Sequence, residues 1–317
     1  MERMKTLEKA EVSQLTTMKV GGIADRICFP TTTNELIDLL DKVISKNEPW
    51  SLLGGGSNIL VSSHDIPGTV ICTTGLNWIE QFGPDLLQAG SGVRLPRLSA
   101  YAAKLSLSGM EFYEGIPGTV GGAIVMNAGA HGSSTSQILE TVTVLNLKTW
   151  KIEILTPSDI KFGYRVSTIN PVDQIVLSAK FRMAPDTEAS IRTRMKENNI
   201  ARQRTQPIKD PSAGCTFRNP IEINMPAGKI LDSIGAKNWQ VGSAQVSSIH
   251  ANFIINLGDA NSQDVCKLMA KLQETTYEKY NILLKPEIKP LGVFNRSEAI
   301  IWTNADQTTN NSFIITK

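Results

Sequence analysis

The feature that most constrains this chain is the stretch from residue 109 to residue 130, GMEFYEGIPGTVGGAIVMNAGA. Glycine recurs in it at positions 115, 118, 121, 122 and 129, between short apolar pieces. Glycine adds no side chain to a core and loses more backbone entropy on folding than other residues. Left-handed dihedrals and close approach of bare backbone N–H groups to a ligand would explain such a density. A tight loop between strands is the alternative explanation.

A second glycine loop, GGGSN at 54–58, lies between the apolar runs 50–53 and 59–61. Those runs are typical of short strands, so the loop is expected to be the turn that connects them. Two such loops in the N-terminal region predict one large, phosphate-bearing cofactor that is held at two points.

Composition narrows the class of protein. The length of 317 residues is enough for two or three domains with a buried core. The net charge of only +2 does not favour nucleic acid or an anionic membrane as a partner. Four widely spaced cysteines and three histidines do not form a zinc pattern, so we expect no metal and a reduced, cytoplasmic compartment. No stretch approaches the roughly 18 apolar residues of a spanning helix, which argues against membrane insertion.

The hydrophobic spacing in the first half predicts a small α/β unit followed by a more strand-rich one. Thr32 and Glu35 form a capping box for a helix that stops near Lys46, and Pro96 opens a second helix that stops at Gly109. Alternating apolar residues predict antiparallel, half-buried strands around 142–144, 152–154 and 175–181.

In the second half, residues 186–209 are predicted to form a basic helix with a linker, and residues 227–234 a short helix. An apolar strand that contains His250 is predicted at 249–256, and a longer helix begins at 261 or 262. Residues 295–317 are polar and aperiodic, and we expect a mobile tail there. The chain is therefore predicted to divide into two N-terminal units, a third unit and a tail, at 1–75, 76–197, 198–294 and 295–317.

Three common phosphate-binding or catalytic motifs are missing from the sequence. Neither glycine loop is followed by Lys-Ser or Lys-Thr at Walker spacing, and the loop at 54–58 lacks the G-x-G-x-x-G spacing of a dinucleotide fold. The G-x-S-x-G elbow of hydrolases does not occur. These absences leave one interpretation, which is a pyrophosphate-bearing ligand bound by loop amides in a way that differs from the Rossmann fold.

Seven motifs in a fixed order carry a resemblance to a known family: LLGGGSNILV (52–61), EGIPGTVGGAIVMNAGA (114–130), GYRVS (163–167), QPIKDPSAGCTFRNP (206–220), AGKILDSIGAK (227–237), HANFIIN (250–256) and LKPEIKPLG (284–292). Together they cover about residues 15 to 292 and resemble the UDP-N-acetylenolpyruvoylglucosamine reductase family, often called MurB. The short spacing between Arg165 and the PSAGC loop resembles the second type of the family, which lacks an inserted, tyrosine-bearing subdomain.

The resemblance implies an α+β fold, with a two-subdomain FAD-binding half of the vanillyl-alcohol-oxidase type and an α+β substrate domain. It implies a cytoplasmic, monomeric enzyme that reduces the enolpyruvyl ether of UDP-N-acetylglucosamine to UDP-N-acetylmuramate, a step of bacterial peptidoglycan synthesis. Non-covalent FAD carries the hydride and NADPH donates it. The partners implied are this UDP-sugar and NADPH, without nucleic acid or membrane.

Three residues stand at the catalytic positions of the family motifs: Arg165, Cys215 and Glu287. Reduction of a double bond conjugated with a carboxylate builds negative charge on that carboxylate, which an arginine can hold with two hydrogen bonds. Without the resemblance, Arg165 would equally well be a surface ion-pair residue and Glu287 a solvated one. The resemblance assigns Glu287 to polarising the enolate.

Cys215 departs from the family, which usually has serine at this position as the proton donor. A free thiol has a pKa near 8.5 and is mostly protonated at neutral pH, so it is a competent general acid. The other three cysteines, Cys28, Cys72 and Cys266, are interpreted as small buried hydrophobes. A thiol beside a redox cofactor is also exposed to oxidation.

The remaining site residues follow from the same motifs. The predicted cofactor-binding residues are Gly54, Gly55, Gly56, Ser57, Asn58, Ile59, Gly118, Thr119, Gly121, Gly122, Ala123 and Asn127. The predicted substrate-binding residues are Asn219 and Lys229, with Arg202 as a third. His250, inside an apolar run, is interpreted as a core histidine.

Two other functions compete with the reductase. One is a flavoprotein oxidase of the same fold, which would use oxygen and often holds its flavin covalently. The other is a catalytically silent module that binds a flavin or a sugar nucleotide. The presence of Arg165, Cys215 and Glu287 argues against a silent module, through the resemblance.

Overall fold

The computed structural model describes residues 4–221, 223–303 and 314–315. The chain divides into two compact units, each made of three chain segments. The first unit contains Met1–Thr6, Cys28–Gly55 and Val70–Arg202. The second contains Leu7–Ile27, Gly56–Thr69 and Gln203–Lys317. The chain passes from one unit to the other inside the GGGSN loop, after Gly55.

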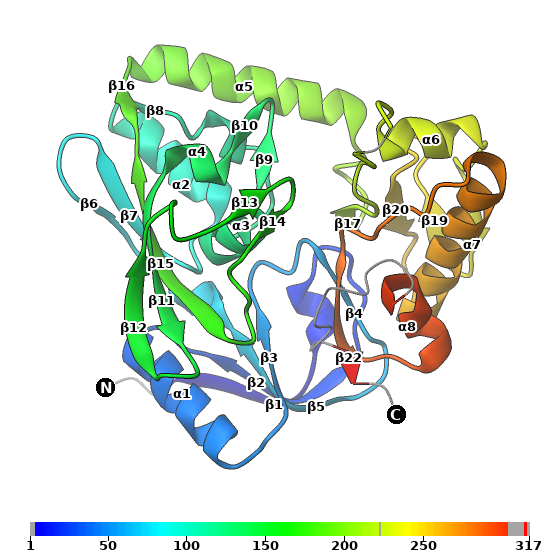
Figure 1. The fold of residues 1–317 in the computed structure, drawn as a ribbon, viewed down its shortest axis with the longest axis horizontal. Coiled ribbons are helices and arrows are strands. Elements are labelled where there is room, and N and C mark those ends of the chain that lie inside the picture. The colour runs from blue at the N-terminus through cyan, green and yellow to red at the C-terminus, as the bar shows by residue number, and fades with distance from the viewer. Residues whose placement is uncertain (1–3, 222, 304–313, 316–317) are drawn as a thin grey trace. The chain divides into compact units, whose positions relative to one another are not determined.

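The strand predicted at 50–53 and the predicted first helix form as expected. The sheet has the order β1-β2-β5-β3, with β1 at Lys5–Glu11, β2 at Ile23–Phe29, β5 at Ile66–Cys72 and β3 at Trp50–Leu53 (Figure 1). Helix α1, Thr33–Ser45, starts where the Thr32 side chain accepts a hydrogen bond from the Glu35 N–H. It buries Leu36, Leu39, Leu40 and Val43 on one face, which is the apolar stripe that its spacing predicts.

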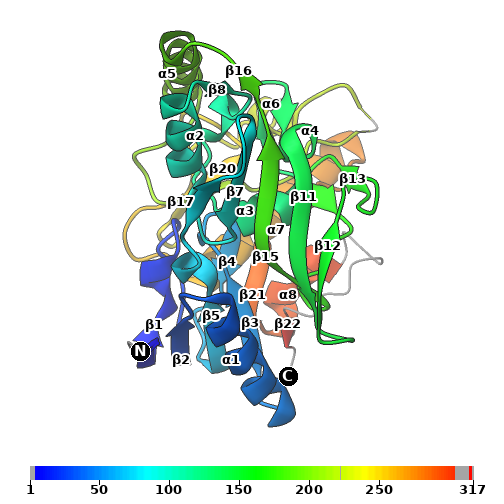
Figure 2. The same cartoon turned by 90° about the vertical axis from the view of Figure 1, so that its left-hand side faces the viewer.

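The first unit is built around a five-stranded sheet of order β12-β11-β15-β7-β6, at Lys151–Leu155, Leu139–Asn146, Gln174–Arg182, Leu86–Gly90 and Ile79–Gln81. The predicted antiparallel pairing of the 142–144, 152–154 and 175–181 segments is confirmed. The prediction of a half-buried strand is wrong for β15. Figure 2 shows β15 beside β11 within this sheet. Ile175 and Leu177 pack in a cluster with α1, whereas Val176, Ala179 and Phe181 pack in a separate cluster. A central strand covered on both faces loses its polar alternation.

The other elements of the first unit lie around the glycine stretch. They are α2 (Leu95–Lys104), β8 (Leu107–Ser108), the 3-10 turn Glu111–Tyr113, α3 (Val120–Met126), β9 (Gly129–Ala130), β10 (Ser133–Ser134), α4 (Thr135–Ile138), β13 (Phe162–Gly163), β14 (Val166–Ser167), β16 (Ala184–Pro185) and α5 (Glu188–Thr205). Helix α2 has Pro96 in its first turn, as predicted. The long helix α5 packs Ile191 and Met195 against Ala103 of α2.

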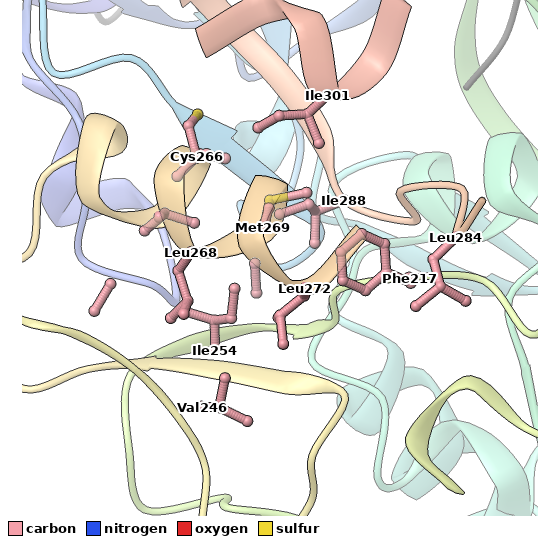
Figure 3. Packing of buried hydrophobic residues seen from close by; sticks show 14 of the residues in the cluster. Phe217, Val246, Ile254, Cys266, Leu268, Met269, Leu272, Leu284, Ile288 and Ile301 are labelled. Atoms are coloured by element: carbon pink, nitrogen blue, oxygen red, sulfur yellow. The ribbon is translucent and has the colours of Figure 1, made fainter. Parts of the chain in front are cut away.

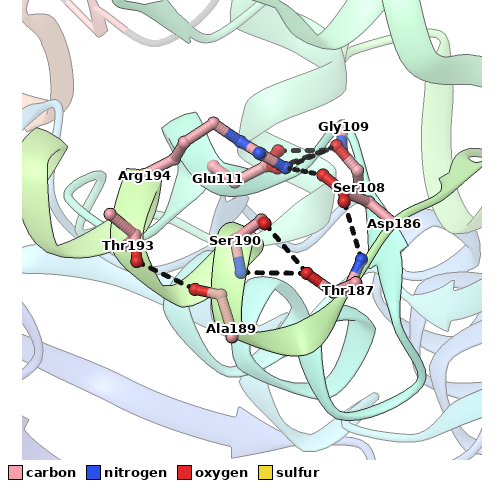
Figure 4. Close-up of polar contacts among 9 residues, drawn as sticks. All are labelled: Ser108, Gly109, Glu111, Asp186, Thr187, Ala189, Ser190, Thr193 and Arg194. Atoms are coloured by element: carbon pink, nitrogen blue, oxygen red, sulfur yellow. Dashed lines mark hydrogen bonds and ion pairs between the residues drawn. The ribbon is translucent and has the colours of Figure 1, made fainter.

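A polar network fixes the start of α5 to the glycine stretch (Figure 4). Arg194 donates to Glu111 Oε1 at 2.6 Å, to Asp186 Oδ2 at 2.7 Å and to Ser108 Oγ at 3.0 Å. Glu111 also accepts a hydrogen bond from the Gly109 N–H at 2.8 Å. Burial would raise the pKa of Glu111, but the hydrogen bonds from Arg194 and the backbone lower its pKa below 4.5.

Replacing Glu111 by glutamine is expected to lower the melting temperature by a few degrees at pH 7. The loss corresponds to about 1 kcal/mol, discounted because Arg194 is partly exposed. The pKa of Glu111 is lower in the folded state than in the unfolded state, so its ionised carboxylate stabilises the fold at pH values above the unfolded-state pKa. This contribution is lost as the pH falls through the folded-state pKa. The difference between Glu111→Gln and wild type should therefore shrink below about pH 4. Thermal melts at both pH values test this, with the exposed Glu188→Gln as control. A difference independent of pH would contradict it.

The second unit contains two sheets and three helices. One sheet has the order β17-β20-β19-β18, at Ser212–Cys215, Phe253–Asn256, Ala244–Val246 and Gln240–Val241. The other pairs β22 (Ile314–Ile315), β21 (Lys289–Val293) and β4 (Ile59–Val61). Helices α6 (Ala227–Ser233) and α7 (Ser262–Tyr280) confirm two predicted helices, and α7 has its predicted Asn261 cap. Leu268 and Leu272 of α7 pack with Ile254 and Phe217 in the core (Figure 3).

The predicted polar tail is wrong over Arg296–Thr303. These residues form helix α8, with Ala299, Ile301 and Trp302 buried. The Trp302 indole stacks edge-on against Phe294 and donates to the Ile288 carbonyl at 3.0 Å. The four apolar residues of this segment are consecutive, at 299–302, and give no periodic signal, so only packing reveals this helix. Residues 304–313 and 316–317 of the predicted tail lie outside the described residues. Within the described residues, no helix has the length and apolar character to span a membrane.

Candidate active site

The glycine stretch folds into the helix α3 and the turns on either side of it. The prediction of left-handed dihedrals is wrong for the glycines at 115, 118, 121, 122 and 129, because positive φ in this part of the chain falls on Gly109, Asn127, His131 and Gly132. Asn127 takes φ of 42° as the C-cap of α3. The five glycines of the motif therefore owe their presence to close contacts or to a ligand.

Three of these glycines have a packing reason. A Cβ on Gly121 would lie 3.1 Å from Ser91 Cβ, and one on Gly129 would lie 2.5 Å from the Ser133 carbonyl oxygen. A Cβ on Gly115 would lie 3.0 Å from Cδ of Arg202. The backbone of Ser133 thus excludes a side chain at Gly129, whereas at Gly121 and Gly115 a side chain would require Ser91 or Arg202 to shift.

Gly122 has no such reason. It is exposed inside α3, and a Cβ there would meet only the Thr119 hydroxyl, at 3.8 Å. Thr119 Oγ1 is buried and has no hydrogen-bond partner among the described residues. Gly54 also approaches it, because a Cβ on Gly54 would lie 2.9 Å from Thr119 Oγ1. Bare backbone on two segments beside an unsatisfied hydroxyl fits a phosphate-bearing cofactor.

Two residues of this region escape the sequence motifs. Arg94 donates to the Gly55 carbonyl at 3.3 Å and forms a β-bridge with Thr119, so it links the two glycine loops. Ser91 has a buried hydroxyl without a partner among the described residues, as Thr119 does. The run SGVRLP at 91–96 carries both residues, and its arginine directly before a helix was the available signal.

Arg165 lies at the turn between β13 and β14, with φ of 59°. Its guanidinium lies over the Tyr164 ring, 5.2 Å from the ring centroid. Asn127 donates through Nδ2 to the Gly163 carbonyl at 3.0 Å, and Ser167 Oγ donates to the Val125 carbonyl at 2.9 Å. One bond on each side of Arg165 therefore ties this hairpin to the C-terminal end of α3. The predicted cofactor residue Asn127 uses both of its side-chain polar atoms within the protein, since its Oδ1 also accepts from the Ser136 N–H.

In the second unit, an isolated bridge joins the segment that follows Cys215 to the segment that contains Glu287. Cys215 ends β17 and is partly exposed. Phe217 and Pro286 form an antiparallel bridge, in which the Glu287 N–H donates to the Thr216 carbonyl at 2.8 Å. Glu287 is half-buried between the buried residues Pro286 and Ile288. This pairing is a tertiary contact that the spacing of the motifs does not reveal.

The later part of the GGGSN loop lies beside the same two strands. Asn58 Nδ2 donates to the Glu287 carbonyl at 3.2 Å, and the Lys289 N–H donates to the Asn58 carbonyl at 2.9 Å. A Cβ on Gly214 would lie 4.0 Å from the Ser57 carbonyl oxygen. Ile59 begins β4, opposite Lys289. Gly56 is required by the backbone itself, because its φ is 63° and a Cβ would lie 2.2 Å from the Leu15 carbonyl oxygen.

The predicted substrate residues fall in both units. Asn219 caps α6, since its Oδ1 accepts from the Ala227 N–H at 2.9 Å. Lys229 is exposed in the first turn of that helix. Arg202, near the C-terminal end of α5, belongs to the first unit, where its side chain lies beside Gly115.

His250 precedes β20 and so lies outside the strand predicted for it. Its Nδ1 accepts a hydrogen bond from the Asn252 N–H at 3.1 Å, and its ring packs edge-on against Phe253. Burial lowers the pKa of His250. A Cβ on Gly228 would lie 2.7 Å from its Cε1, so the ring has no space on that side. These contacts support its interpretation as a packed, structural histidine.

Comparison with known proteins defines the class. A family model described as FAD binding domain matches residues 24–151. A second model, described as UDP-N-acetylenolpyruvoylglucosamine reductase, C-terminal domain, matches residues 206–291. Together with the glycine-lined backbone beside Thr119, these matches define the chain as an FAD-dependent oxidoreductase. They also confirm the predicted fold class, in which an FAD-binding half is followed by a C-terminal domain.

Relatives along most of the chain identify the family. The UDP-N-acetylenolpyruvoylglucosamine reductase of Bacillus subtilis is 37% identical over 290 residues, which are 91% of this chain and 94% of the relative. The one from a Synechococcus strain is 38% identical over 90% of both chains. The crystal structure of the Thermus caldophilus enzyme matches with a TM-score of 0.76 at 33% identity, covering 91% of this chain and 98% of that one. The chain belongs to the UDP-N-acetylenolpyruvoylglucosamine reductase family.

The contrast between Gly121 and Gly122 gives a test of the cofactor site. Alanine at exposed Gly122 should stabilise the apoprotein by about 0.5–1 kcal/mol, since alanine is the better helix former. The same methyl group should weaken FAD binding by at least about tenfold, which is about 1.4 kcal/mol. Thermal melts of apoprotein and FAD titration measure the two effects. Gly121→Ala, which crowds Ser91, should instead lower stability. Unchanged FAD affinity in Gly122→Ala would contradict this role for Gly122.

Proposed function

We propose that this chain reduces UDP-N-acetyl-3-O-(1-carboxyvinyl)glucosamine to UDP-N-acetylmuramate, with NADPH as the hydride donor, in peptidoglycan precursor synthesis. The observation that carries the proposal is the bridge between Phe217 and Pro286 in the second unit, in which the Glu287 N–H donates to the carbonyl of Thr216, the residue after Cys215. The relatives named above support the choice of substrate, because their names specify the enolpyruvyl sugar nucleotide.

FAD, when bound, supplies the hydride-transfer chemistry that links NADPH to the double bond of the substrate. The residues that would hold it are the bare backbone at Gly54, Gly55 and Gly122, with Thr119 beside them. The other proposed cofactor residues are Gly56, Ser57, Asn58, Ile59, Gly118, Gly121, Ala123 and Asn127. We propose that the last of these acts by holding the Arg165 hairpin on α3.

Each proposed catalytic residue has one task. Arg165 binds the carboxylate of the enolpyruvyl group, where negative charge grows as the double bond is reduced. Glu287 polarises the resulting enolate. The Cys215 thiol donates its proton to the carbon next to the carboxylate, which completes the saturated lactyl ether. Arg202, Asn219 and Lys229 bind the remainder of the sugar nucleotide. We also propose that the enzyme is a cytoplasmic monomer, with its subdomains divided near residues 75 and 197.

Anaerobic titration of the purified protein tests this function. Denaturation should release yellow, non-covalent flavin. NADPH should bleach the bound flavin without oxygen, and the enolpyruvyl sugar nucleotide should restore the colour. A flavoprotein oxidase would be reoxidised by oxygen alone, and a silent binding module would not be bleached by NADPH. Either result would overturn the proposal.

A further inference from the structure

Arg218 is a half-buried cation that no catalytic or binding role yet explains. Its Nε atom is buried and has no hydrogen-bond partner among the residues that the structure describes. A guanidinium carries five N–H donors and stays charged at any physiological pH. Leaving such a donor buried and unsatisfied costs about 1–3 kcal/mol, so the residue is expected to have a partner in the working enzyme.

Strand geometry places the Arg218 side chain on the same face as that of Glu287. The Arg218 N–H donates to the Lys285 carbonyl at 2.8 Å, next to the bridge between Phe217 and Pro286. Phe217 is fully buried in the hydrophobic core of the second unit (Figure 3). Because successive side chains along a strand point to opposite faces, Thr216 and Arg218 turn away from this core.

Positive charge accumulates around Arg218. Lys285 lies directly opposite it in the strand pair. Asn219, the next residue, caps α6 and thereby fixes the first turn of that helix, where Lys229 is exposed. Arg218 and Lys285 therefore form a pair of opposed cations, which favours an anionic ligand. Arginine matches phosphate oxygens particularly well, since two parallel N–H groups can bind two oxygens.

We propose that Arg218 binds the diphosphate of the sugar nucleotide and so determines specificity for a nucleoside diphosphate over a monophosphate. This inference rests on the proposed function, in which the other anionic group of the substrate, its carboxylate, is bound by Arg165. Arg218 acts in binding, and the proton-transfer step does not require it.

Calorimetric titration of holoenzyme with UDP and with UMP tests the proposal without turnover. Arg218→Gln should weaken UDP binding by about 10- to 100-fold, the range for a charged hydrogen-bonded pair, and UMP binding much less. KM for the enolpyruvyl sugar nucleotide should rise by a similar factor while kcat stays within a few-fold. Arg218→Lys should restore part of the affinity, because it keeps the charge but loses the paired geometry. Arg296→Gln, at an exposed arginine of the same unit, should change nothing.

Three results would overturn the inference: no UDP binding by wild type, an unchanged UDP-to-UMP affinity ratio in Arg218→Gln, or a loss confined to NADPH affinity in anaerobic flavin bleaching. Loss of FAD from Arg218→Gln would also overturn it, by showing that the arginine holds the cofactor. Failure of the proposed function is recognised separately, since wild-type protein would then not turn over the enolpyruvyl sugar nucleotide.

Discussion

Cys215→Ala is expected to lower turnover of the enolpyruvyl sugar nucleotide by about 10²- to 10⁴-fold, the usual contribution of a general acid. Bleaching of the flavin by NADPH should be nearly unchanged, because that half of the reaction needs no proton from Cys215. Rapid mixing under anaerobic conditions separates the two halves. The expected signature is a bleached flavin that regains its colour slowly when substrate is added.

Cys215→Ser is the matched variant for this experiment. A hydroxyl has nearly the volume of the thiol and is the group that the family usually has here, so much of the activity should remain. The serine variant should also resist inactivation by peroxide better than wild type, because serine cannot follow the oxidation ladder of a thiol. Equal loss of activity in Cys215→Ala and Cys215→Ser would mean that the thiol is needed for something other than proton donation.

Arg165→Asn should have opposite effects on activity and stability. Its kcat should fall by about 10²- to 10³-fold, as when one group that stabilises a growing oxyanion is removed. Stability should stay the same or rise by up to about 1 kcal/mol, because Arg165 is held at φ of 59° and asparagine tolerates this left-handed conformation better. Steady-state kinetics and thermal melts measure the two effects on one preparation. A purely structural arginine would lower both stability and activity.

The hairpin supplies a control for this second experiment. Ser167→Ala removes the hydrogen bond to the Val125 carbonyl but leaves the guanidinium in place. Losing one neutral hydrogen bond costs about 1 kcal/mol, so activity should fall by less than tenfold with the flavin content unchanged. A fall as large as that of Arg165→Asn would show that the position of the hairpin, rather than the arginine charge, limits the reaction.

Local signals in the chain predicted most individual elements. Thr32 caps α1, Pro96 lies in the first turn of α2, and Asn261 caps α7, because capping depends on residues within one turn of each other. The failures have tertiary causes. Strand β15 is covered on both faces by separate clusters, and α8 forms because Trp302 packs against Phe294. No local pattern encodes what a distant segment will cover.

The glycine stretch shows the same division. Its sequence indicates that backbone must approach something closely, and with the companion loop it indicates a phosphate-bearing cofactor. Only the folded chain separates Gly121, crowded by Ser91, from Gly122, where a methyl group would meet only the Thr119 hydroxyl. A Cβ clash is a property of three-dimensional neighbours, and sequence spacing contains no information about them.

The sequence by itself determined the family, the residue types of the proposed chemistry and the order in which their motifs occur. The tertiary structure decided which of them meet. Cys215 and Glu287 belong to distant motifs and become neighbours through the bridge between Phe217 and Pro286. Arg218 emerges as a candidate ligand group only because that bridge buries its Nε atom without a partner among the described residues. Pairing of distant strands is driven by burial of a shared core, and this is a property of the whole fold.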